Sequence, residues 1–432
     1  MICQTERHSI IALIKKEVVP AMGCTEPIAV ALAVAKATEL LGCRPTPPEK
    51  IQVFLSANIL KNALGVGIPG TSMIGLPIAV ALGALIGKSE YELEVIRNVN
   101  PAAVEEGKEY IAGNHINIAL KDGDIPKLYI EVEASDGNGN SATAIIANDH
   151  NRFVFLRRND EILLDARSTG LSTENDEQES SAPELTLKKV WEYATESPLE
   201  ELRFILQARQ LNKAIAERSF AGEFGHSVGR VLRKSNSLLG DCLYTRILSY
   251  TTAACDARMA GAQMPVMSNS GSGNQGIAAT LPVCVYAEEY FASEEQTVRA
   301  LILSHLTVIY IKQSLGKLSA LCGCVVAATG SACGICYLMG GDYEKIAATA
   351  KNMVANLTGM ICDGAKPSCA MKLASGVSTA MLSAMMAMDN QCVTSTQGIV
   401  DDDVDKTIHN LTSIGREGMA ETDRMILKIM TE

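Results

Sequence analysis

The sequence predicts an α+β protein with an N-terminal mixed α/β domain that contains a β-sheet and a mostly all-α C-terminal domain. Strand-like runs, rich in β-branched residues or alternating between apolar and polar, fall before residue 160. From residue 185 onward almost every segment has helical periodicity or composition. With 432 residues and 47% hydrophobic side chains, the chain can bury two cores.

The N-terminal domain is expected to span residues 1–168. Its strands are predicted at 51–55, 128–133, 142–146 and 153–156. The second and third of these are joined by Asp136-Gly137-Asn138-Gly139-Asn140, a sequence that favours a β-hairpin. The sheet of this domain is therefore expected to be at least partly antiparallel.

Residues 169–184 are acidic and polar with almost no apolar side chains, which predicts an exposed linker between the domains. The helical domain then spans residues 185–432. Few aromatic residues and many Ala, Gly and Met residues indicate closely packed helices. They are expected at 190–217, 243–259, 276–291, 295–311, 343–360, 371–388 and 402–430.

Charge and hydropathy exclude several classes of partner. The net charge is −11 without a basic block, which argues against nucleic acid or an anionic membrane as the partner. The apolar stretches 74–86 and 277–286 contain Gly or Pro and are shorter than the ~20 residues of a membrane span. The first residues lack the charged and apolar regions of a signal peptide. We expect a cytoplasmic protein that acts on a small molecule.

Cysteine usage is the most informative feature of the composition. Six of the thirteen cysteines lie between residues 322 and 369. Cytosolic thiols stay reduced, so clustered cysteines are metal ligands, catalytic groups or buried small hydrophobes rather than disulfides. Cys362 and Cys369 flank a turn at 363–368, where thiolates can converge on one metal centre.

The remaining metal-ligand patterns favour packing. Cys333 and Cys336 form a C-x-x-C pair inside an apolar helical run, with no second pair at zinc-finger spacing. The six histidines show no paired spacing, and His305 on an apolar helix is expected to be a hydrogen-bonded core residue. A cluster held by three thiolates would be different in kind. A [4Fe–4S] cluster with three cysteine ligands keeps one iron open as a Lewis acid, whereas redox clusters usually have four ligands.

A second chemical candidate lies near the N-terminus. Thr25 or Glu26 can cap a helix with Pro27 in its first turn, and Gly42 can end it. Cys24 then lies just outside the helix N-terminus, where the dipole should lower its pKa from about 8.5 towards neutrality. Such a thiolate can act as a general base or nucleophile. The alternative is a buried structural cysteine.

Two glycine-rich loops are candidate anion sites. Residues 271–276 match G-x-G-x-x-G, but no hydrophobic strand precedes them, so a nicotinamide site is not favoured. The loop leads into a helix near Ile277, whose N-terminal amides suit a substrate carboxylate. Residues 65–71 lack the P-loop lysine and contain Pro69, so ATP binding is not indicated. This loop can bind an anion or form a simple turn between helices.

Several segments together resemble the L-cysteine desulfidase family across essentially the whole chain. The helical half is also similar to the α part of the iron–sulfur L-serine dehydratases. The segments are Met22-Gly23-Cys24-Thr25-Glu26-Pro27, residues 61–71, Asp256-Ala257-Arg258-Met259, residues 268–276, Leu321-Cys322-Gly323-Cys324 and residues 359–366.

The resemblance implies a lyase that converts L-cysteine to hydrogen sulfide, ammonia and pyruvate by β-elimination, without pyridoxal phosphate, using a [4Fe–4S] cluster. Cys24 would be the base that abstracts the Cα proton. The cluster ligands would be Cys324, Cys362 and Cys369, with Cys322 as the alternative to Cys324. The substrate would be bound by Lys61, Asn62, Gly70, Thr71, Ser270 and Asn274.

Two other functions remain open at this point. The same cluster would suit an L-serine or L-threonine dehydratase, and a non-catalytic iron–sulfur sensor would need the cluster alone. Ala63-Leu64 differs from the Gly-Met expected after the Lys-Asn pair, close to the expected substrate site. Helical enzymes of this size often assemble as homodimers, which we also expect here.

Overall fold

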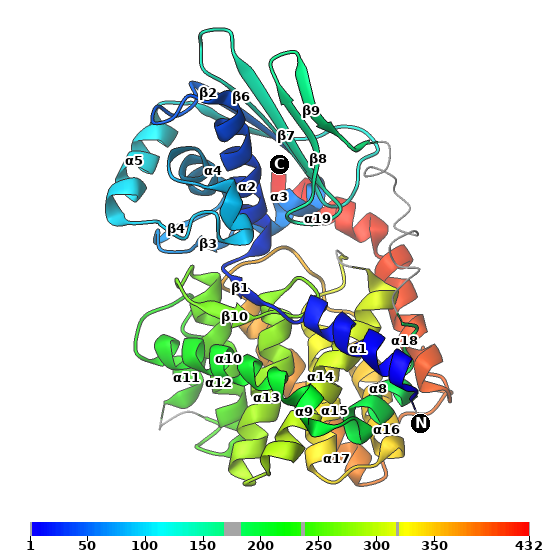
Figure 1. Ribbon diagram of the computed structural model, residues 1–432. Coiled ribbons are helices and arrows are strands. Elements are labelled where there is room, and N and C mark those ends of the chain that lie inside the picture. Colours follow the sequence, from blue (N-terminus) through cyan, green and yellow to red (C-terminus); the bar gives the residue numbers. More distant parts are fainter. Residues whose placement is uncertain (1, 168–182, 235–237, 317–318, 432) are drawn as a thin grey trace.

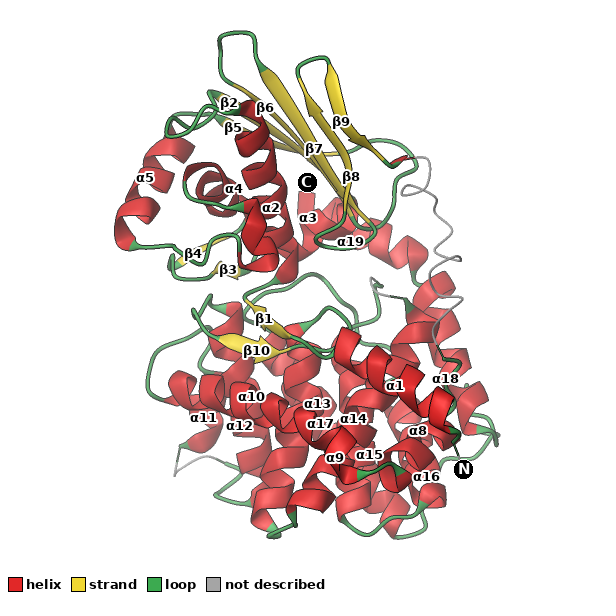
Figure 2. Cartoon of the chain, in the orientation of Figure 1, coloured by secondary structure: helices red, strands yellow, loops and turns green. Residues whose placement is uncertain are grey.

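The computed structural model describes residues 2–167, 183–234, 238–316 and 319–431. It confirms the predicted α+β class: an α/β part with a six-stranded sheet lies beside a helical part (Figures 1 and 2). The predicted linker falls almost entirely on residues 168–182, which lie outside the described ranges.

The α/β part is built on one mixed sheet in the order β5-β2-β6-β7-β8-β9, in which only β2 and β5 are parallel. The predicted strands and the hairpin between β6 and β7 are confirmed. The elements are α2 (Thr25–Leu41), β2 (Lys50–Leu55), α3 (Ala57–Ala63), β3 (Gly67–Ile68), β4 (Met73–Ile74), α4 (Leu76–Leu85), η1 (Ser89–Glu94), α5 (Pro101–Ala112), β5 (Ile116–Leu120), β6 (Tyr129–Ser135), β7 (Ser141–Ala147), β8 (Phe153–Arg158) and β9 (Glu161–Asp165).

Helix α2 is the core of this part and packs against β6, β7 and α4. Its residues are buried on nearly all sides, which explains its almost continuous apolar sequence. The two edge strands β5 and β9 escaped prediction. No residue of either strand is fully buried. Ile162 and Leu163 of β9 are both exposed, so the alternation that signals a half-buried strand is absent from β9.

The helical part contains most of the remaining chain, and the two short strands β1 and β10 pair on its surface facing the α/β part (Figure 1). Its elements are α1 (Gln4–Glu17), β1 (Pro20–Met22), α8 (Leu187–Glu196), α9 (Leu199–Leu202), η2 (Arg203–Ile205), α10 (Leu206–Phe220), α11 (Val228–Arg233), α12 (Leu243–Met259), β10 (Pro265–Met267), α13 (Gly273–Glu289), α14 (Glu294–Leu315), α15 (Gly323–Leu338), α16 (Tyr343–Asn356), α17 (Cys369–Met388), α18 (Val404–Ser413), η3 (Ile414–Gly418) and α19 (Ala420–Thr431).

Two predicted helices are broken. The single helix expected at 190–217 ends at Glu196, because Ser197 is extended and Pro198 has no amide hydrogen with which to continue it. The helix expected at 402–430 is interrupted by the π-helical turn η3. The hydrophobic periodicity of both segments is helical, but this periodicity does not indicate where a helix is interrupted.

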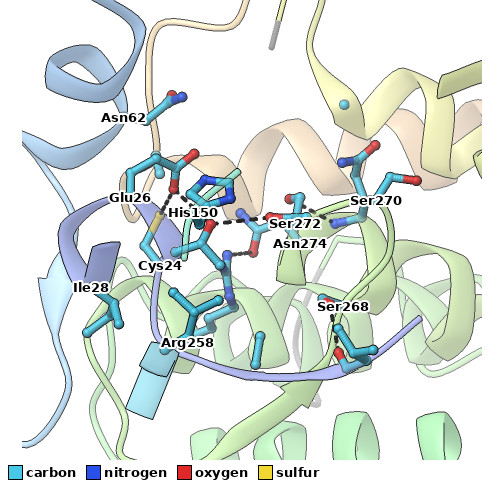
Figure 3. Close-up of a pocket in the computed structure, with 18 of the residues that line it drawn as sticks. Cys24, Glu26, Ile28, Asn62, His150, Arg258, Ser268, Ser270, Ser272 and Asn274 are labelled. Carbon is cyan, nitrogen blue, oxygen red and sulfur yellow. Dashed lines mark hydrogen bonds between the residues drawn. The ribbon is translucent and has the colours of Figure 1, made fainter. Parts of the chain in front are cut away.

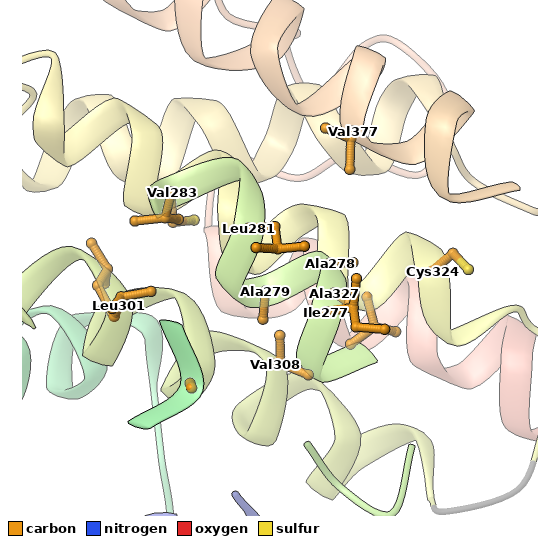
Figure 4. Close-up of a cluster of buried hydrophobic side chains, with 14 of the residues drawn as sticks. Ile277, Ala278, Ala279, Leu281, Val283, Leu301, Val308, Cys324, Ala327 and Val377 are labelled. Carbon is orange, nitrogen blue, oxygen red and sulfur yellow. The ribbon is translucent and has the colours of Figure 1, made fainter. Parts of the chain in front are cut away.

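Close contact between α13, α14, α15 and α17 forms the main core, in which small residues separate the larger Ile, Leu and Val side chains (Figure 4). At Gly330 of α15, an added Cβ would lie 2.4 Å from the Ser304 carbonyl oxygen of α14. Only glycine therefore allows these two helices to approach so closely. The expectation of tightly packed helices is met by this arrangement.

Helix α17 begins with a candidate ligand, Cys369, and packs against α12, α15 and α16. Within the described ranges it is the one helix long and apolar enough to cross a membrane by length and composition. More than half of its apolar window, 56%, is buried inside the protein. Burial of this extent is typical of a helix in a protein core.

Both chain ends cross between the two parts. Helix α1 packs on α14, and β1 pairs antiparallel with β10, so the first described residues lie with the helical part. Helix α19 returns to contact α3 of the α/β part. The junction between the parts is thus formed by segments that are far apart in the sequence.

Asn212 of α10 links β10 to α13 beneath this junction. Its side-chain oxygen accepts from the Met267 amide at 2.8 Å. Its side-chain nitrogen donates to the Gly276 carbonyl at 3.2 Å and to the Thr280 hydroxyl at 3.1 Å. The residue is fully buried, so these bonds replace all of its contacts with water.

Replacing Asn212 with alanine should lower the free energy of unfolding by about 2–3 kcal/mol, because a buried amide donor loses its partner. Urea unfolding followed by circular dichroism measures this change. Gln207→Ala, at an exposed position on the same helix, is the control and should change stability by less than about 0.5 kcal/mol. Equal effects of the two substitutions would contradict this role of Asn212.

Candidate active site

A cavity of about 480 Å³ lies where the two parts meet. The start of α2 and the β7–β8 turn line it from the α/β part. The loop between β10 and α13 and the cysteine-bearing segments line it from the helical part (Figure 3). The cavity is therefore lined by short segments that are far apart in the sequence.

The segment carrying Cys24 is fixed to the helical part by backbone contacts. Strand β1 pairs with β10 so that Pro20 lies opposite Met267 and Met22 opposite Pro265. Directly after β1, the Gly23 carbonyl accepts a hydrogen bond from Arg258 Nη2 at 2.8 Å. Gly23 itself has a positive φ of 68°, which turns the chain from β1 into α2.

Cys24 is the N-cap of α2, in place of the predicted Thr25 or Glu26, while Gly42 ends the helix as predicted. The thiol is only 3% exposed and donates to Glu26 Oε2 at 2.9 Å. The same carboxylate oxygen accepts from the Thr25 hydroxyl at 3.2 Å. Figure 3 shows Cys24 and Glu26 facing each other on the cavity wall.

The expected lowering of the Cys24 pKa is wrong. Burial, followed by the negative charge of Glu26, raises the pKa of Cys24 well above its ordinary value, although the Arg258 guanidinium opposes this shift. The helix N-terminus does lie at Cys24, but its partial charge is weaker than the loss of hydration and the adjacent carboxylate. The thiol is therefore protonated in the resting protein.

Arg258 of α12 connects the Cys24 segment to α13. Besides Gly23, it donates from Nη1 to Asn274 Oδ1 at 3.0 Å, and Cys255 also donates to this oxygen at 3.5 Å. The Asn274 side-chain nitrogen contacts the Met259 sulfur at 3.3 Å. Asn274 thus reaches the cavity, but its polar atoms bind protein groups, and it positions Arg258.

The loop before α13 forms a tight turn at the cavity. Asn269 and Ser272 exchange two backbone hydrogen bonds, and Ser270 and Gly271 between them have φ angles of 47° and 78°. Positive φ at both central positions is the geometry of a type I′ turn. The Ser272 hydroxyl then caps α13, and the Gly271 carbonyl oxygen lies 3.3 Å from Thr25 Oγ1, as a second acceptor for the hydroxyl hydrogen that Thr25 shares with Glu26. The predicted helix after this loop is confirmed.

The candidate cluster ligands come from two adjacent segments. A backbone bridge between Leu321 and Ile361 places Cys322, the N-cap of α15, beside Cys362. The Cys322 amide donates to Met360 at 2.8 Å and the Cys362 amide to Ala320 at 2.7 Å. The four predicted candidates all line the cavity: Cys322, Cys324, Cys362 and Cys369.

The chemistry of this donor set fits an iron–sulfur cluster, because it is made of cysteine thiols alone, three of them buried and Cys362 partly buried. The Cys322 thiol lies within hydrogen-bonding range of both Cys324 and Cys362, and its bond to Cys324 raises the pKa of Cys322. Throughout the described ranges, no three His, Cys, Asp or Glu side chains surround a single-ion position. A cubane cluster binds each cysteine through a different iron, so its ligands need not meet at one point.

Two further polar groups near these cysteines were not predicted. Cys255 of α12 is fully buried, and its pKa is raised by burial and by the nearby Cys369. Lys312 of α14 lines the cavity, and burial lowers its pKa to about 8, against the influence of Cys362 and Glu17. Neither residue belongs to a local motif, so only the packing of the helices reveals its place.

The predicted substrate residues divide into two groups. Asn62, Ser270 and Asn274 line the cavity. Lys61 does not: it is 2% exposed, forms an ion pair with Asp423 of α19, and faces a separate cavity of about 660 Å³.

The loop at 65–71 is also absent from the cavity wall. The Gly70 amide donates to Gly261 at 3.2 Å, and the Thr71 hydroxyl donates to Ile68 at 2.8 Å. An added Cβ at Gly67 would lie 2.3 Å from the Ala260 carbonyl carbon. These contacts favour the alternative interpretation of this loop, a packed turn.

The residues predicted to be packing groups are confirmed as such. Cys333 and Cys336 are fully buried in α15, and the Cys336 sulfur contacts Met388 at 3.9 Å. His305 is buried, and its ring nitrogens contact Asn269 and Thr280, both at 3.0 Å. Burial lowers the pKa of His305 to about 3, so the ring is neutral and supports the loop before α13.

Sequence reasoning missed several other residues of the cavity wall. Glu26 and Arg258 lie inside recognised segments but had been given no chemical role there. Gln275 lies in the glycine-rich loop, and its side-chain oxygen is buried without a hydrogen-bond partner in the described protein. His150 in the β7–β8 turn reaches the cavity from the sheet, and no sequence pattern indicated it.

Comparison with known proteins adds independent evidence. The family model of the serine dehydratase alpha chain matches residues 90–428. A UPF0597 protein of Bacteroides fragilis is 63% identical over 430 residues, covering 99% of both chains. Similar proteins in Porphyromonas gingivalis and Shewanella halifaxensis are 55% and 44% identical, covering 98% and 96% of this chain and 98% and 97% of theirs.

The family match covers strands β5 to β9 of the sheet, most of the helical part and every candidate cluster ligand. The full-length similarity extends it over the Cys24 segment. The chain therefore belongs to the serine dehydratase alpha chain family, within the iron–sulfur serine dehydratase-like superfamily.

Proposed function

We propose that this protein is a lyase that releases hydrogen sulfide from L-cysteine, leaving ammonia and pyruvate, without pyridoxal phosphate. The observation that carries the proposal is the single cavity that contains both Cys24 and the four cysteines of the cluster segments. A buried thiol beside a carboxylate on one wall and metal-binding thiols on another supply the two elements of an assisted elimination.

A [4Fe–4S] cluster would be held by Cys324, Cys362 and Cys369, with Cys322 as the alternative to Cys324. When bound through three cysteines, it supplies an open iron, a Lewis acid for the substrate's leaving group. The chain contributes the positions of the ligands. The bridge between Leu321 and Ile361 fixes two of the segments, and the start of α17 fixes Cys369.

The substrate carboxylate would lie at the start of α13, where free backbone amides and the helix dipole favour an anion. Arg258 adds a buried positive charge, and the Ser270 and Asn62 side chains line the same space. The unpartnered Gln275 oxygen is an acceptor suited to the substrate ammonium. These contacts would orient the Cα–H bond towards Cys24.

Cys24 would take the Cα proton. Its position on α2 is fixed by the β1–β10 pairing and by the Arg258 bond to Gly23. The cavity lies between the two parts and has little exposed surface at Cys24, which excludes water from the reacting atoms.

The family match favours one alternative, dehydration of L-serine or L-threonine in the same cavity. The same proton abstraction would then release water in place of hydrogen sulfide. Substrate preference can separate the two functions, because both depend on the same cysteines and the same base.

Anaerobically reconstituted protein should release sulfide from L-cysteine with a larger kcat/KM than it shows for ammonia release from L-serine. Sulfide and pyruvate assays over a range of substrate concentrations measure both values. A larger kcat/KM for serine would support the dehydratase alternative. Protein that carries the cluster but acts on no amino acid would contradict both.

Replacing Cys362 or Cys369 with alanine should abolish the broad visible absorption of the cluster and reduce bound iron per chain. Cys322→Ala and Cys324→Ala should differ in the visible absorption of the cluster. The variant that loses this absorption identifies the third ligand. Cys333→Ala, in the same helix as Cys324 but packed in the core, is the control. Full absorption after loss of Cys362 would exclude it as a ligand.

Cys24→Ala should reduce kcat by about 10³-fold while absorption and iron content stay unchanged, because a general base contributes 10²–10⁴-fold. Cys242→Ala, which removes an exposed cysteine outside the cavity, should leave kcat unchanged. A non-catalytic sensor would predict no difference between these two variants.

A further inference from the structure

We propose that Glu26 receives, through the Cys24 thiol, the proton that leaves the substrate Cα. This role rests on the proposed elimination and adds a residue that acts through the base. No sequence motif gave Glu26 a chemical role, and the proposal depends on its position in the structure. Figure 3 shows its carboxylate beside the Cys24 sulfur, joined to it by a hydrogen bond.

The geometry is that of a formed hydrogen bond. Cys24 Sγ lies 2.9 Å from Glu26 Oε2, and the S–H group donates to it. Thr25 donates to the same oxygen at 3.2 Å, which holds the carboxylate in place from a second direction. Glu26 is 9% exposed, and within the described protein no basic side chain forms an ion pair with it. The thiol can thus pass on its proton without a change of side-chain conformation.

Cys24 alone is poorly suited to be the base. Burial and the neighbouring carboxylate keep its proton bound, so almost no thiolate exists at neutral pH. A thiol can accept a proton from carbon only if it releases its own at the same time. Glu26 is the acceptor already in contact with it, and Arg258 is the positive charge that favours the transient thiolate.

The transfer balances as follows for L-cysteine. The Cα–H bond breaks and its proton joins Cys24 Sγ, while the original S–H proton moves to Glu26 Oε2. The electron pair of the Cα–H bond forms the Cα–Cβ double bond, and the Cβ–S bond breaks with its pair on the departing hydrosulfide. The negative charge of the Glu26 carboxylate is thereby transferred to the hydrosulfide. The proton on Glu26 can then return to that group to give hydrogen sulfide.

The other charged groups of the cavity are placed differently. The positive charge of Arg258 from α12 lowers the pKa of Cys24, against the effect of Glu26. The other charged groups that line the cavity are Lys16 and Glu17 from α1, Glu94 from η1, Asp149 and His150 from the β7–β8 turn, and Lys312 from α14.

A purely structural role for Glu26 makes the opposite prediction for activity. A carboxylate that only suppresses the thiolate would, once neutralised, leave a more acidic thiol and a faster enzyme. A carboxylate that receives the proton would leave a more acidic thiol and a slower enzyme. Thiol reactivity and turnover must therefore be measured on the same variant.

Glu26→Gln keeps the size and an acceptor oxygen but cannot take up the proton. The alkylation rate of Cys24 by iodoacetamide, followed by mass spectrometry of its peptide across pH, should show the midpoint moving to lower pH. In the same cluster-loaded preparation, kcat at pH 7 should fall at least about 100-fold with visible absorption unchanged. Above pH 7, the kcat of this variant should increase about tenfold per pH unit, because solvent replaces Glu26 as the proton acceptor. Glu26→Asp should restore part of the loss.

Glu94→Gln, the same chemical change at an exposed position of the cavity rim, is the control and should alter neither measurement. Unchanged or increased kcat in Glu26→Gln would overturn the proposal, as would an unshifted Cys24 midpoint. A third outcome separates the two proposals: the alkylation midpoint of Cys24 differs between wild-type protein and Glu26→Gln, but the wild-type protein turns over neither cysteine nor serine. That result would overturn the proposed function and the proton transfer to Glu26. The hydrogen bond between Cys24 and Glu26 would still be supported.

Discussion

The Arg258 guanidinium bridges the segments on which the cavity depends. One nitrogen binds the Gly23 carbonyl ahead of Cys24, and another binds Asn274 at the start of α13. Arg258 is 3% exposed, so the loss of either bond would leave part of a buried positive charge without a partner. An added Cβ at Gly273 would lie 2.3 Å from Arg258 Nε, so the loop must also be glycine at that position.

The two walls of the cavity are built by different physical means. The Cys24 wall is fixed by strand pairing and by charge, through β1, β10 and Arg258. The cluster wall is fixed by backbone hydrogen bonds at the Leu321–Ile361 bridge and by packing of α15 against α17. Each wall can therefore be altered with limited effect on the other, which is why cluster content and turnover are separable measurements.

Local sequence patterns were sufficient for much of the fold. Alternation over 51–55 and the Asp136–Asn140 turn predicted β2 and the β6–β7 hairpin, and residues 243–259 form α12 with the predicted bounds. Edge strands and helix breaks were missed, because their signals depend on which face is exposed and on single residues such as Pro198. Cys362 and Cys369 could be selected because they flank a turn, in contrast to Cys333 within α15, whereas Cys322 and Cys324 were selected by the resemblance to a known family.

The sequence by itself determined the α+β class, the packing role of Cys333, Cys336 and His305, and the set of cysteines that reach the cavity. Tertiary structure decided the charge state of Cys24, because burial, the largest cause of its raised pKa, depends on segments that are distant in the sequence. It also separated Lys61 from the substrate residues, since its ion-pair partner Asp423 lies 362 positions away. Long-range contacts set hydration and charge, and these properties decide the chemistry of a thiol.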